Sequence, residues 1–139
     1  MIVTLWAMET TKSKTILLVD DDADYLFQIK TFLLSMGFAV VTAGSQREAE
    51  HILERIKPDL AILDLMMERH DAGFTLCNLI KTLYPGVPII MASAVTSETG
   101  LMFDLTTQEG KEWMQADIFL DKSIRHDQLQ REIFKLLKI

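Results

Sequence analysis

The chain has 139 residues, of which 49% are hydrophobic and 24% are charged, a composition that predicts one globular domain rather than a disordered or fibrous chain. The 14 basic and 20 acidic residues give a net charge of −6, which argues against binding to nucleic acid, because neutralising phosphates needs a basic surface. The single cysteine, Cys77, excludes an internal disulfide. No apolar run approaches the ~20 residues that cross a bilayer, so we expect no membrane span.

Residues 1–14 are expected to be a flexible lead-in to the folded domain. The segment 1–8 is short, has no basic residue and lacks a small-residue cleavage site, so a secretory signal is not predicted. We therefore expect a cytoplasmic protein, whether the natural chain begins at Met1 or at Met8. The folded domain is expected over residues 15–139, with no output domain attached.

Short apolar runs alternate with segments of helical periodicity along the rest of the chain. The apolar runs predict five strands, at residues 15–20, 39–43, 60–64, 88–93 and 117–121. Between and after them, apolar residues recur every three or four positions and predict helices. These positions are, in chain order, Leu26, Ile29 and Leu33, then Ala49, Ile52, Leu53 and Ile56, then Leu76, Ile80 and Leu83, and finally Leu129, Ile133, Leu136 and Leu137.

Residues at the ends of these segments support the prediction. Ser45 and Glu48 have the spacing of a capping box, and Gly37 follows the first helix where a left-handed residue commonly ends one. Strands joined by helical crossovers form a parallel sheet with helices on both faces. The sequence therefore predicts a single α/β domain of the (βα)5 type, and the irregular stretch 94–116 fits this alternation least well.

Four of the predicted strands carry polar or charged residues at their carboxyl ends, where open parallel sheets bind their ligands. In chain order these residues are Asp20, Asp21 and Asp22, then Asp64, then Ser93 and then Lys122. Neighbouring carboxylates repel one another and favour a hard divalent cation, and a lysine and a hydroxyl beside them suit phosphoryl transfer. Asp64, at the base of the predicted pocket, is the natural acceptor for an acyl phosphate.

Each of these residues also has a plainer interpretation. An acidic triplet after a strand is as often a solvated loop or a helix N-cap, and an aspartate at a strand end often caps a turn. A lone serine or lysine at a strand end carries no information by itself. The occurrence of all of them at four strand ends, in this order, is what favours a phosphoryl-transfer site.

The chain resembles the receiver domains of two-component response regulators in four segments: ILLVDDDADYL (16–26), PDLAILDLMM (58–67), VPIIMASA (87–94) and ADIFLDKS (116–123). The resemblance extends from about Thr15 to Leu137. It implies a flavodoxin-like, doubly wound parallel sheet with the strand order 2-1-3-4-5. It also implies a bacterial, cytoplasmic signalling protein rather than an enzyme with its own catalytic domain.

The resemblance implies that Asp64 accepts a phosphoryl group. The donor is implied to be a sensor histidine kinase or a phosphotransfer protein, and Ser93 and Lys122 are implied to contact the group once it is attached. Ser93 and Phe119 are then implied to switch the face formed by the last two strands and the last two helices. The signal is expected to pass by contact with a downstream protein that the sequence does not name, and a homodimer stays open.

The resemblance also implies Mg²⁺ as the cofactor. Its direct ligands would be the carboxylates of Asp21 and Asp64 and the backbone carbonyl of Met66. Asp20 would act through water.

Three features depart from the family pattern. Ser123 follows Lys122 in place of the usual proline, so we predict a trans peptide bond there, because a cis bond before another residue costs ~3–4 kcal/mol. The loop after Asp64 is one residue longer than usual. The interval from Ser93 to Lys122 is several residues longer than usual, and the excess falls in the irregular stretch.

Two other functions stay open at this stage. The Asp-x-Asp patterns in residues 20–24 are also typical of aspartate-nucleophile, Mg²⁺-dependent phosphatases, but those enzymes need an acidic pair after the lysine, and Lys122 is followed by Ser-Ile-Arg-His. The second alternative is a receiver-like binding module that is never phosphorylated. The presence of Asp21, Asp64 and Lys122 argues against it.

Overall fold

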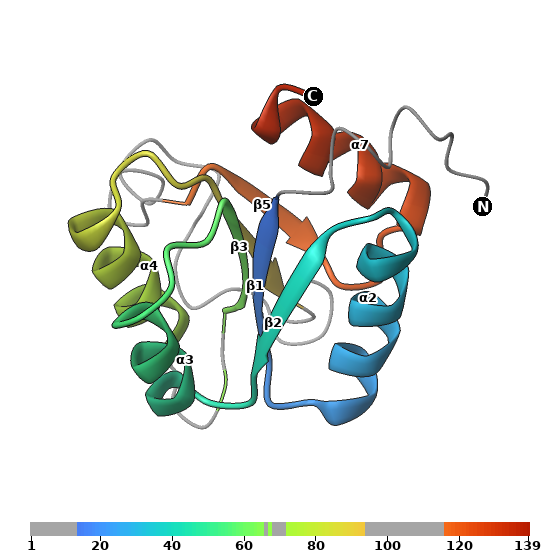
Figure 1. The fold of residues 1–139 in the computed structure, drawn as a ribbon. Coiled ribbons are helices and arrows are strands. Elements are labelled where there is room, and N and C mark those ends of the chain that lie inside the picture. The colour runs from blue at the N-terminus through green and yellow to red at the C-terminus, as the bar shows by residue number, and fades with distance from the viewer. Residues whose placement is uncertain (1–13, 66, 68–71, 94–115) are drawn as a thin grey trace.

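The computed structural model describes residues 14–65, 67, 72–93 and 116–139, which form five strands and four helices (Figure 1). In chain order these are β1 (Thr15–Val19), α2 (Ala23–Ser35), β2 (Ala39–Ala43), α3 (Gln46–Leu53), β3 (Leu60–Asp64), α4 (Ala72–Leu83), β4 (Ile89–Ser93), β5 (Ile118–Asp121) and α7 (His126–Leu137). The expected lead-in up to residue 13 and most of the irregular stretch, residues 94–115, lie outside the described residues. None of the four helices is long and apolar enough to span a membrane.

The strands form one parallel sheet in the order β2-β1-β3-β4-β5, which confirms the predicted flavodoxin-like α/β fold. The predicted ranges 15–20, 88–93 and 117–121 each exceed the observed strand by one residue, and the other two agree with it. Because parallel strands run in the same direction, their carboxyl ends meet at one edge of the sheet. At that edge β1 and β3 are neighbours, so the residues that follow them are brought together.

Helices cover both faces of the sheet, with α3 and α4 on one side and α2 and α7 on the other (Figure 1). Successive strand residues alternate between two hydrophobic cores. In β1, Leu17 and Val19 belong to the core under α3 and α4, whereas Ile16 and Leu18 belong to the core under α2 and α7. β3 and β4 are likewise fully buried, which explains why these inner strands have continuous apolar sequences.

The two ends of α2 follow from local sequence. Asp22 is the N-cap, and its Oδ1 accepts hydrogen bonds from the backbone N–H groups of Asp24 and Tyr25 at 3.0 and 3.3 Å. At the other end, Gly37 has a φ of 94°, the left-handed conformation that ends a helix, as predicted. The helix therefore begins immediately after the acidic residues that follow β1, and its first turn lies beside them.

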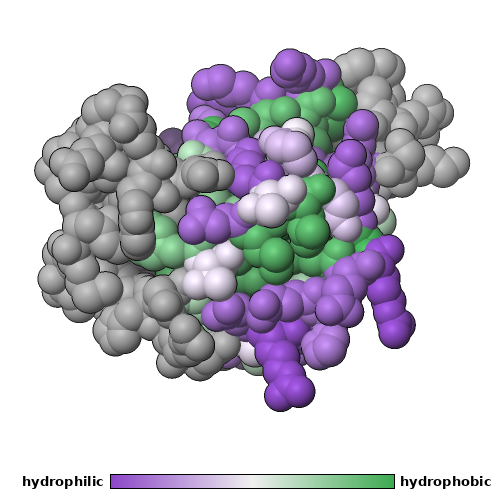
Figure 2. Space-filling model, turned by 90° about the vertical axis from the view of Figure 1, so that its left-hand side faces the viewer, coloured by the Kyte–Doolittle hydropathy of each residue, from purple (hydrophilic) through white to green (hydrophobic). Residues whose placement is uncertain are grey.

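On the side of the molecule that carries α3 and α4, hydrophobic residues form a band flanked by hydrophilic ones (Figure 2). A groove lies at the end of α3 and just after it, and it is lined by His51, Ile52, Arg55 and Ile56. A crossover helix runs back against the strand direction, so this groove lies toward the amino ends of the strands. It is separate from the sheet edge at which the acidic residues gather.

Candidate functional site

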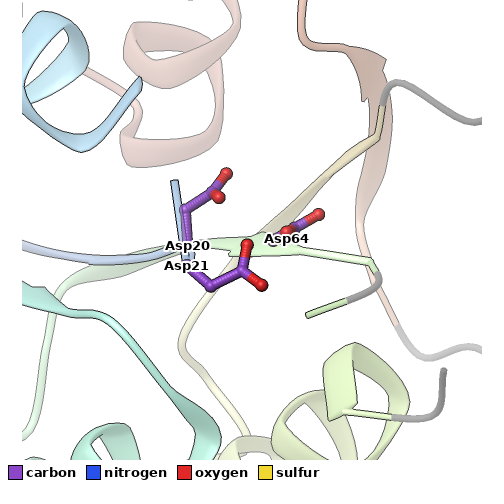
Figure 3. A group of neighbouring side chains, drawn as sticks. All are labelled: Asp20, Asp21 and Asp64. Atoms are coloured by element: carbon purple, nitrogen blue, oxygen red, sulfur yellow. The ribbon is translucent and has the colours of Figure 1, made fainter. Parts of the chain in front are cut away.

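Three aspartate side chains gather at the carboxyl ends of the adjacent strands β1 and β3 (Figure 3). Asp20 and Asp21 directly follow β1, and Asp64 is the last residue of β3. One carboxylate oxygen of each lies within 4.8 Å of the other two. Asp20 is fully buried and Asp64 is 5% exposed, whereas Asp21 is exposed. The structure thus brings together the three carboxylates predicted at the Mg²⁺ site, two as direct ligands and Asp20 through water; we refer to them as the carboxylate cluster.

Lys122, which follows β5, brings a positive charge to the carboxylate cluster. Its Nζ lies 2.6 Å from Oδ2 of Asp20 and 3.4 Å from Oδ1 of Asp64. Burial acts to lower the pKa of the Lys122 ammonium, but the close contact with Asp20 and the charge of Asp64 outweigh burial and raise that pKa. The side chain is therefore charged at neutral pH, and its one positive charge lies beside two of the three carboxylates.

Hydrogen bonds at both ends of β5 hold this strand, which Lys122 follows, in place. The N–H of Lys122 donates to the carbonyl oxygen of Ser93 at 3.1 Å, one step beyond the end of β5. Before the other end of β5, Oδ2 of Asp117 accepts hydrogen bonds from the N–H of Ile89 at 2.8 Å and from Nζ of Lys81 at 3.1 Å. This edge strand is therefore anchored to its neighbours at both ends.

The acidic run after β1 serves both the carboxylate cluster and the start of α2. Oδ1 of Asp20 accepts a hydrogen bond from the N–H of Asp22 at 2.9 Å, which leaves Oδ2 for Lys122. Asp22 caps α2, so the helix N-cap interpretation of the acidic triplet is correct for this residue. These hydrogen bonds fix the turn from β1 into α2 and, with it, the directions in which Asp20 and Asp21 extend.

Tyr25, in the first turn of α2, is a neighbour of the site that the sequence patterns did not indicate. Nζ of Lys122 lies over its ring, 4.9 Å from the centroid. Burial raises the pKa of the Tyr25 phenol, and the charges of Asp20 and Asp64 raise it further. A signal was available, because an aromatic residue three positions after the N-cap Asp22 lies in the turn of helix closest to the strand ends.

Ser93 and Phe119, the predicted switch residues, lie on the adjacent strands β4 and β5, and β4 is the strand that pairs with β3. Ser93 ends β4 and is 6% exposed, and the residue before it, Ala92, pairs with Asp64. Phe119 pairs with Met91 in the β4–β5 register and packs against the core under α3 and α4. Because side chains alternate along a strand, Ser93 shares the face of Met91, which is also the face of Phe119.

The peptide bond between Lys122 and Ser123 is trans, as predicted, since no cis bond occurs in the described part of the chain. The N–H and the hydroxyl of Ser123 both donate to Oδ1 of Asp121, at 2.9 and 2.8 Å. The backbone carbonyl of Met66, predicted as a metal ligand, and most of the longer loop after Asp64 lie outside the described residues.

The carboxylate cluster fits a hard divalent cation such as Mg²⁺. Three carboxylates carry more negative charge than Lys122 neutralises. Oδ2 of Asp20 is buried and accepts no hydrogen bond of regular geometry from the described residues; its contact with Lys122 is an ion pair. Mg²⁺ prefers carboxylate oxygens and retains several waters, and the exposed position of Asp21 leaves one side of the cluster open to them.

Residues 16–134 match the family described as the response regulator receiver domain. The transcriptional regulatory protein GlrR of Escherichia coli (strain K12) is 37% identical over 122 residues, which are 88% of this chain and 26% of GlrR. Protein RcaC of Microchaete diplosiphon is 28% identical over an alignment of 125 residues that covers 88% of this chain and 18% of RcaC. The chain thus corresponds to a minor part of the length of these relatives.

Two solved structures share the fold over nearly their whole length. A CheY-like response regulator receiver domain protein from Methanospirillum hungatei JF-1 has a TM-score of 0.77 and 26% identity, covering 90% of this chain and 94% of that one. TrrA of Thermotoga maritima, solved in complex with Mg²⁺ and BeF, has a TM-score of 0.72 and 26% identity, covering 88% and 98%. With its sheet order and its match over residues 16–134, the chain belongs to the response regulator receiver domain family of two-component systems.

Proposed function

We propose that Asp64 accepts a phosphoryl group in a Mg²⁺-dependent reaction and that the modified protein signals by contact with another protein. The observation that carries the proposal is the position of Asp64. Its carboxylate ends β3, is 5% exposed, and lies among Asp20, Asp21 and Lys122. A carboxylate nucleophile needs positive charge nearby to hold the oxygens of the incoming group, and these neighbours offer an ammonium and oxygen ligands for a cation.

The donor in this proposal is a histidine kinase or a phosphotransfer protein that carries the phosphoryl group on an imidazole nitrogen. An oxygen of Asp64 attacks the phosphorus, and the new O–P bond forms as the N–P bond breaks. The electron pair of the broken bond returns to the imidazole, which takes up a proton. A carboxylate nucleophile needs no general base, so the described residues have only to bind, orient and neutralise.

The residues around Asp64 divide these tasks. Bound Mg²⁺ would supply positive charge to the phosphoryl oxygens. Asp21, Asp64 and the carbonyl of Met66 would hold the ion directly, and Asp20 would hold it through water. Lys122, with Nζ now 3.4 Å from Oδ1 of Asp64, would pair with a phosphoryl oxygen once the Asp64 oxygen is bonded to phosphorus.

Ser93 and Phe119 would carry the signal away from Asp64. The hydroxyl of Ser93, at the end of β4, would donate to a phosphoryl oxygen. Because Ser93 and Phe119 share one side of the sheet, movement of Ser93 toward Asp64 would leave space into which the Phe119 ring can turn. The face formed by β4, β5 and the last helices would then change shape and bind a downstream protein. A cytoplasmic location is part of the same proposal.

Incubation with acetyl phosphate and Mg²⁺, followed by measurement of the intact mass, tests this function. We expect the wild-type protein to gain one phosphoryl group and Asp64→Asn to gain none. Asp24→Asn is the matched control, because Asp24 is an exposed aspartate in the first turn of α2 that lies outside the carboxylate cluster; it should label like the wild type. Removal of Mg²⁺ with EDTA should prevent labelling. An unlabelled wild type, or an Asp64→Asn variant labelled to the same extent, would overturn the proposal.

A further inference from the structure

The ammonium of Lys122 has an aromatic neighbour as well as two carboxylate neighbours. Nζ lies 4.9 Å from the centroid of the Tyr25 ring, within the ~6 Å at which a cation over a ring face is attracted by the ring quadrupole. Its other neighbours are Oδ2 of Asp20 at 2.6 Å and Oδ1 of Asp64 at 3.4 Å. The side chain is 18% exposed, so it lies mostly shielded from water beside the ring and the carboxylates.

These contacts belong to a chain of contacts that runs through the start of α2 and returns to Lys122. Nζ of Lys122 meets Oδ2 of Asp20, and Oδ1 of Asp20 accepts from the N–H of Asp22 at 2.9 Å. Oδ1 of Asp22 accepts from the N–H of Tyr25 at 3.3 Å, and the Tyr25 ring lies against Nζ. The hydrogen bonds of the turn between β1 and α2 therefore orient the Asp20 carboxylate and also place the Tyr25 ring.

The ring and the carboxylates hold Lys122 in different ways. A bound cation and an attached phosphoryl group would both interact with Asp20 and Asp64. The attraction of these two carboxylates for Nζ of Lys122 would then weaken, at the stage when Nζ has to contact the phosphoryl group. The attraction of the ring does not depend on those carboxylates. It also needs only the ring face, and not the hydroxyl.

We propose that Tyr25 is a positioning residue, which keeps Nζ of Lys122 at the phosphoryl site while Asp20 and Asp64 change partners. This role rests on the proposed function of Asp64. The plain alternative is that Tyr25 only packs against the core under α2 and α7, which it also contacts. The two roles make different predictions for phenylalanine and leucine at this position, because both fill apolar space but only phenylalanine keeps the aromatic face.

The rate of labelling by acetyl phosphate at saturating Mg²⁺ separates the two roles. Tyr25→Phe should retain the wild-type rate, whereas Tyr25→Leu should label about fivefold more slowly. The Mg²⁺ concentration for half-maximal labelling should stay the same in both variants, since the carboxylates are intact. In a Lys122→Ala background, Tyr25→Leu should have no further effect, because Tyr25 acts through Lys122.

Side-chain NMR of Lys122 supplies a readout that needs no phosphorylation. The ring current of residue 25 should shift the Cε protons of Lys122 in the wild type and in Tyr25→Phe, and the shift should vanish in Tyr25→Leu. Equal labelling rates for Tyr25→Leu and the wild type, or an unchanged Cε shift in Tyr25→Leu, would overturn the positioning role and leave the role of Asp64 intact. A wild type that does not label at Asp64 would instead overturn the proposed function and, with it, any part for Tyr25 in the reaction.

Discussion

Lys122 and Asp20 form an ion pair whose side chains are 18% and 1% exposed, with 2.6 Å between Nζ and Oδ2. Removing one partner from such a pair is more costly than replacing both, because the remaining charge is left without water and without a counterion. Asp20 is the more deeply buried of the two. The stability of the fold therefore depends on a positive charge beside Asp20, whether it belongs to Lys122 or to a bound metal ion.

Replacing Lys122 by methionine keeps a side chain of similar length and removes the charge. In metal-free buffer, we expect Lys122→Met to lower the free energy of unfolding by about 3–5 kcal/mol. Added Mg²⁺ should restore more stability to this variant than it adds to the wild type, because the ion takes over the neutralisation of Asp20. Urea unfolding with and without Mg²⁺ measures both effects, and Lys30→Met, which changes an exposed lysine of α2, is the control. A smaller Mg²⁺ response in Lys122→Met than in the wild type would contradict this account.

Gly73, in the first turn of α4, packs against the backbone that carries Asp64. A Cβ at this position would lie 2.6 Å from the carbonyl oxygens of Asp64 and Leu65, and backbone atoms cannot move aside as a flexible side chain would. We expect Gly73→Ala to lower the free energy of unfolding by about 1–3 kcal/mol and to slow labelling of Asp64. Gly86→Ala is the control, because its Cβ would meet no atom within 4 Å. Equal unfolding midpoints for the two variants would show that α4 adjusts without strain.

Among the elements, those whose ends depend on near neighbours in the sequence were predictable. Ser45 caps α3 by accepting from the N–H of Glu48 at 3.1 Å, and Gly37 ends α2, each at the position that its residue type indicates. The strands were predictable because inner parallel strands are apolar throughout. The sheet order came instead from the resemblance to receiver domains, since alternation of strands and helices does not by itself choose an order. Asp64 was predicted as the phosphoryl acceptor from its position at a strand end, and the resemblance implies the same role.

Contacts between distant segments could not be predicted in this way. Tyr25 meets Lys122 across the sheet edge, and Lys81 meets Asp117 at a separation of 36 positions. The Lys81–Asp117 contact has no sequence signal of its own, because a lysine near a helix end is usually solvated. The position of Tyr25 in the first turn of α2 indicates that it lies near the strand ends, but not that its ring meets Lys122. Only the folded arrangement of α2, α4 and β5 shows which charges and rings become neighbours.

The start of β5 is the place where such a distant contact has a measurable effect. Nζ of Lys81 donates to Oδ2 of Asp117 at 3.1 Å and to the carbonyl oxygen of Val87 at 2.9 Å. β5 is a partly exposed edge strand that pairs with β4. We expect Lys81→Met to speed amide hydrogen exchange in β5 about tenfold, with little change in β1 and β3, because a hydrogen bond to a charged group is lost at one end of the strand. Lys135→Met, at an exposed lysine of α7, is the control; equal acceleration in every strand would mean that the contact supports the whole fold rather than β5.

At the scale of the whole molecule, the acidic groups behind the net charge of −6 do not all affect the stability of the fold to the same extent. Three of the acidic groups stand within 4.8 Å of one another at one edge of the sheet, where they repel each other unless a cation lies between them. Any ligand that binds only the folded state stabilises that state. Cation binding at the carboxylate cluster and the stability of the entire domain are therefore coupled.

Asp21→Asn distinguishes the repulsion among the carboxylates in the metal-free protein from the stabilisation that bound Mg²⁺ provides. Asp21 is exposed, so neutralising it opens no cavity and relieves its repulsion with Asp20 and Asp64. Without metal, we expect the variant to be at least as stable as the wild type. At a Mg²⁺ concentration about 100 times the dissociation constant, the wild type should gain about 2.7 kcal/mol and the variant much less, so that their order of stability reverses.

Thermal unfolding over a series of Mg²⁺ concentrations at constant ionic strength measures this reversal, since screening by salt alone would also reduce the repulsion. Asp24→Asn removes an equal charge from an exposed position outside the carboxylate cluster, and it should follow the wild type. If Mg²⁺ stabilises Asp21→Asn as much as the wild type, Asp21 is not a ligand, and its charge acts only through repulsion. A reversal confined to Asp21→Asn would instead mean that an exposed carboxylate, which lowers the stability of the metal-free fold, is retained because it binds the ion.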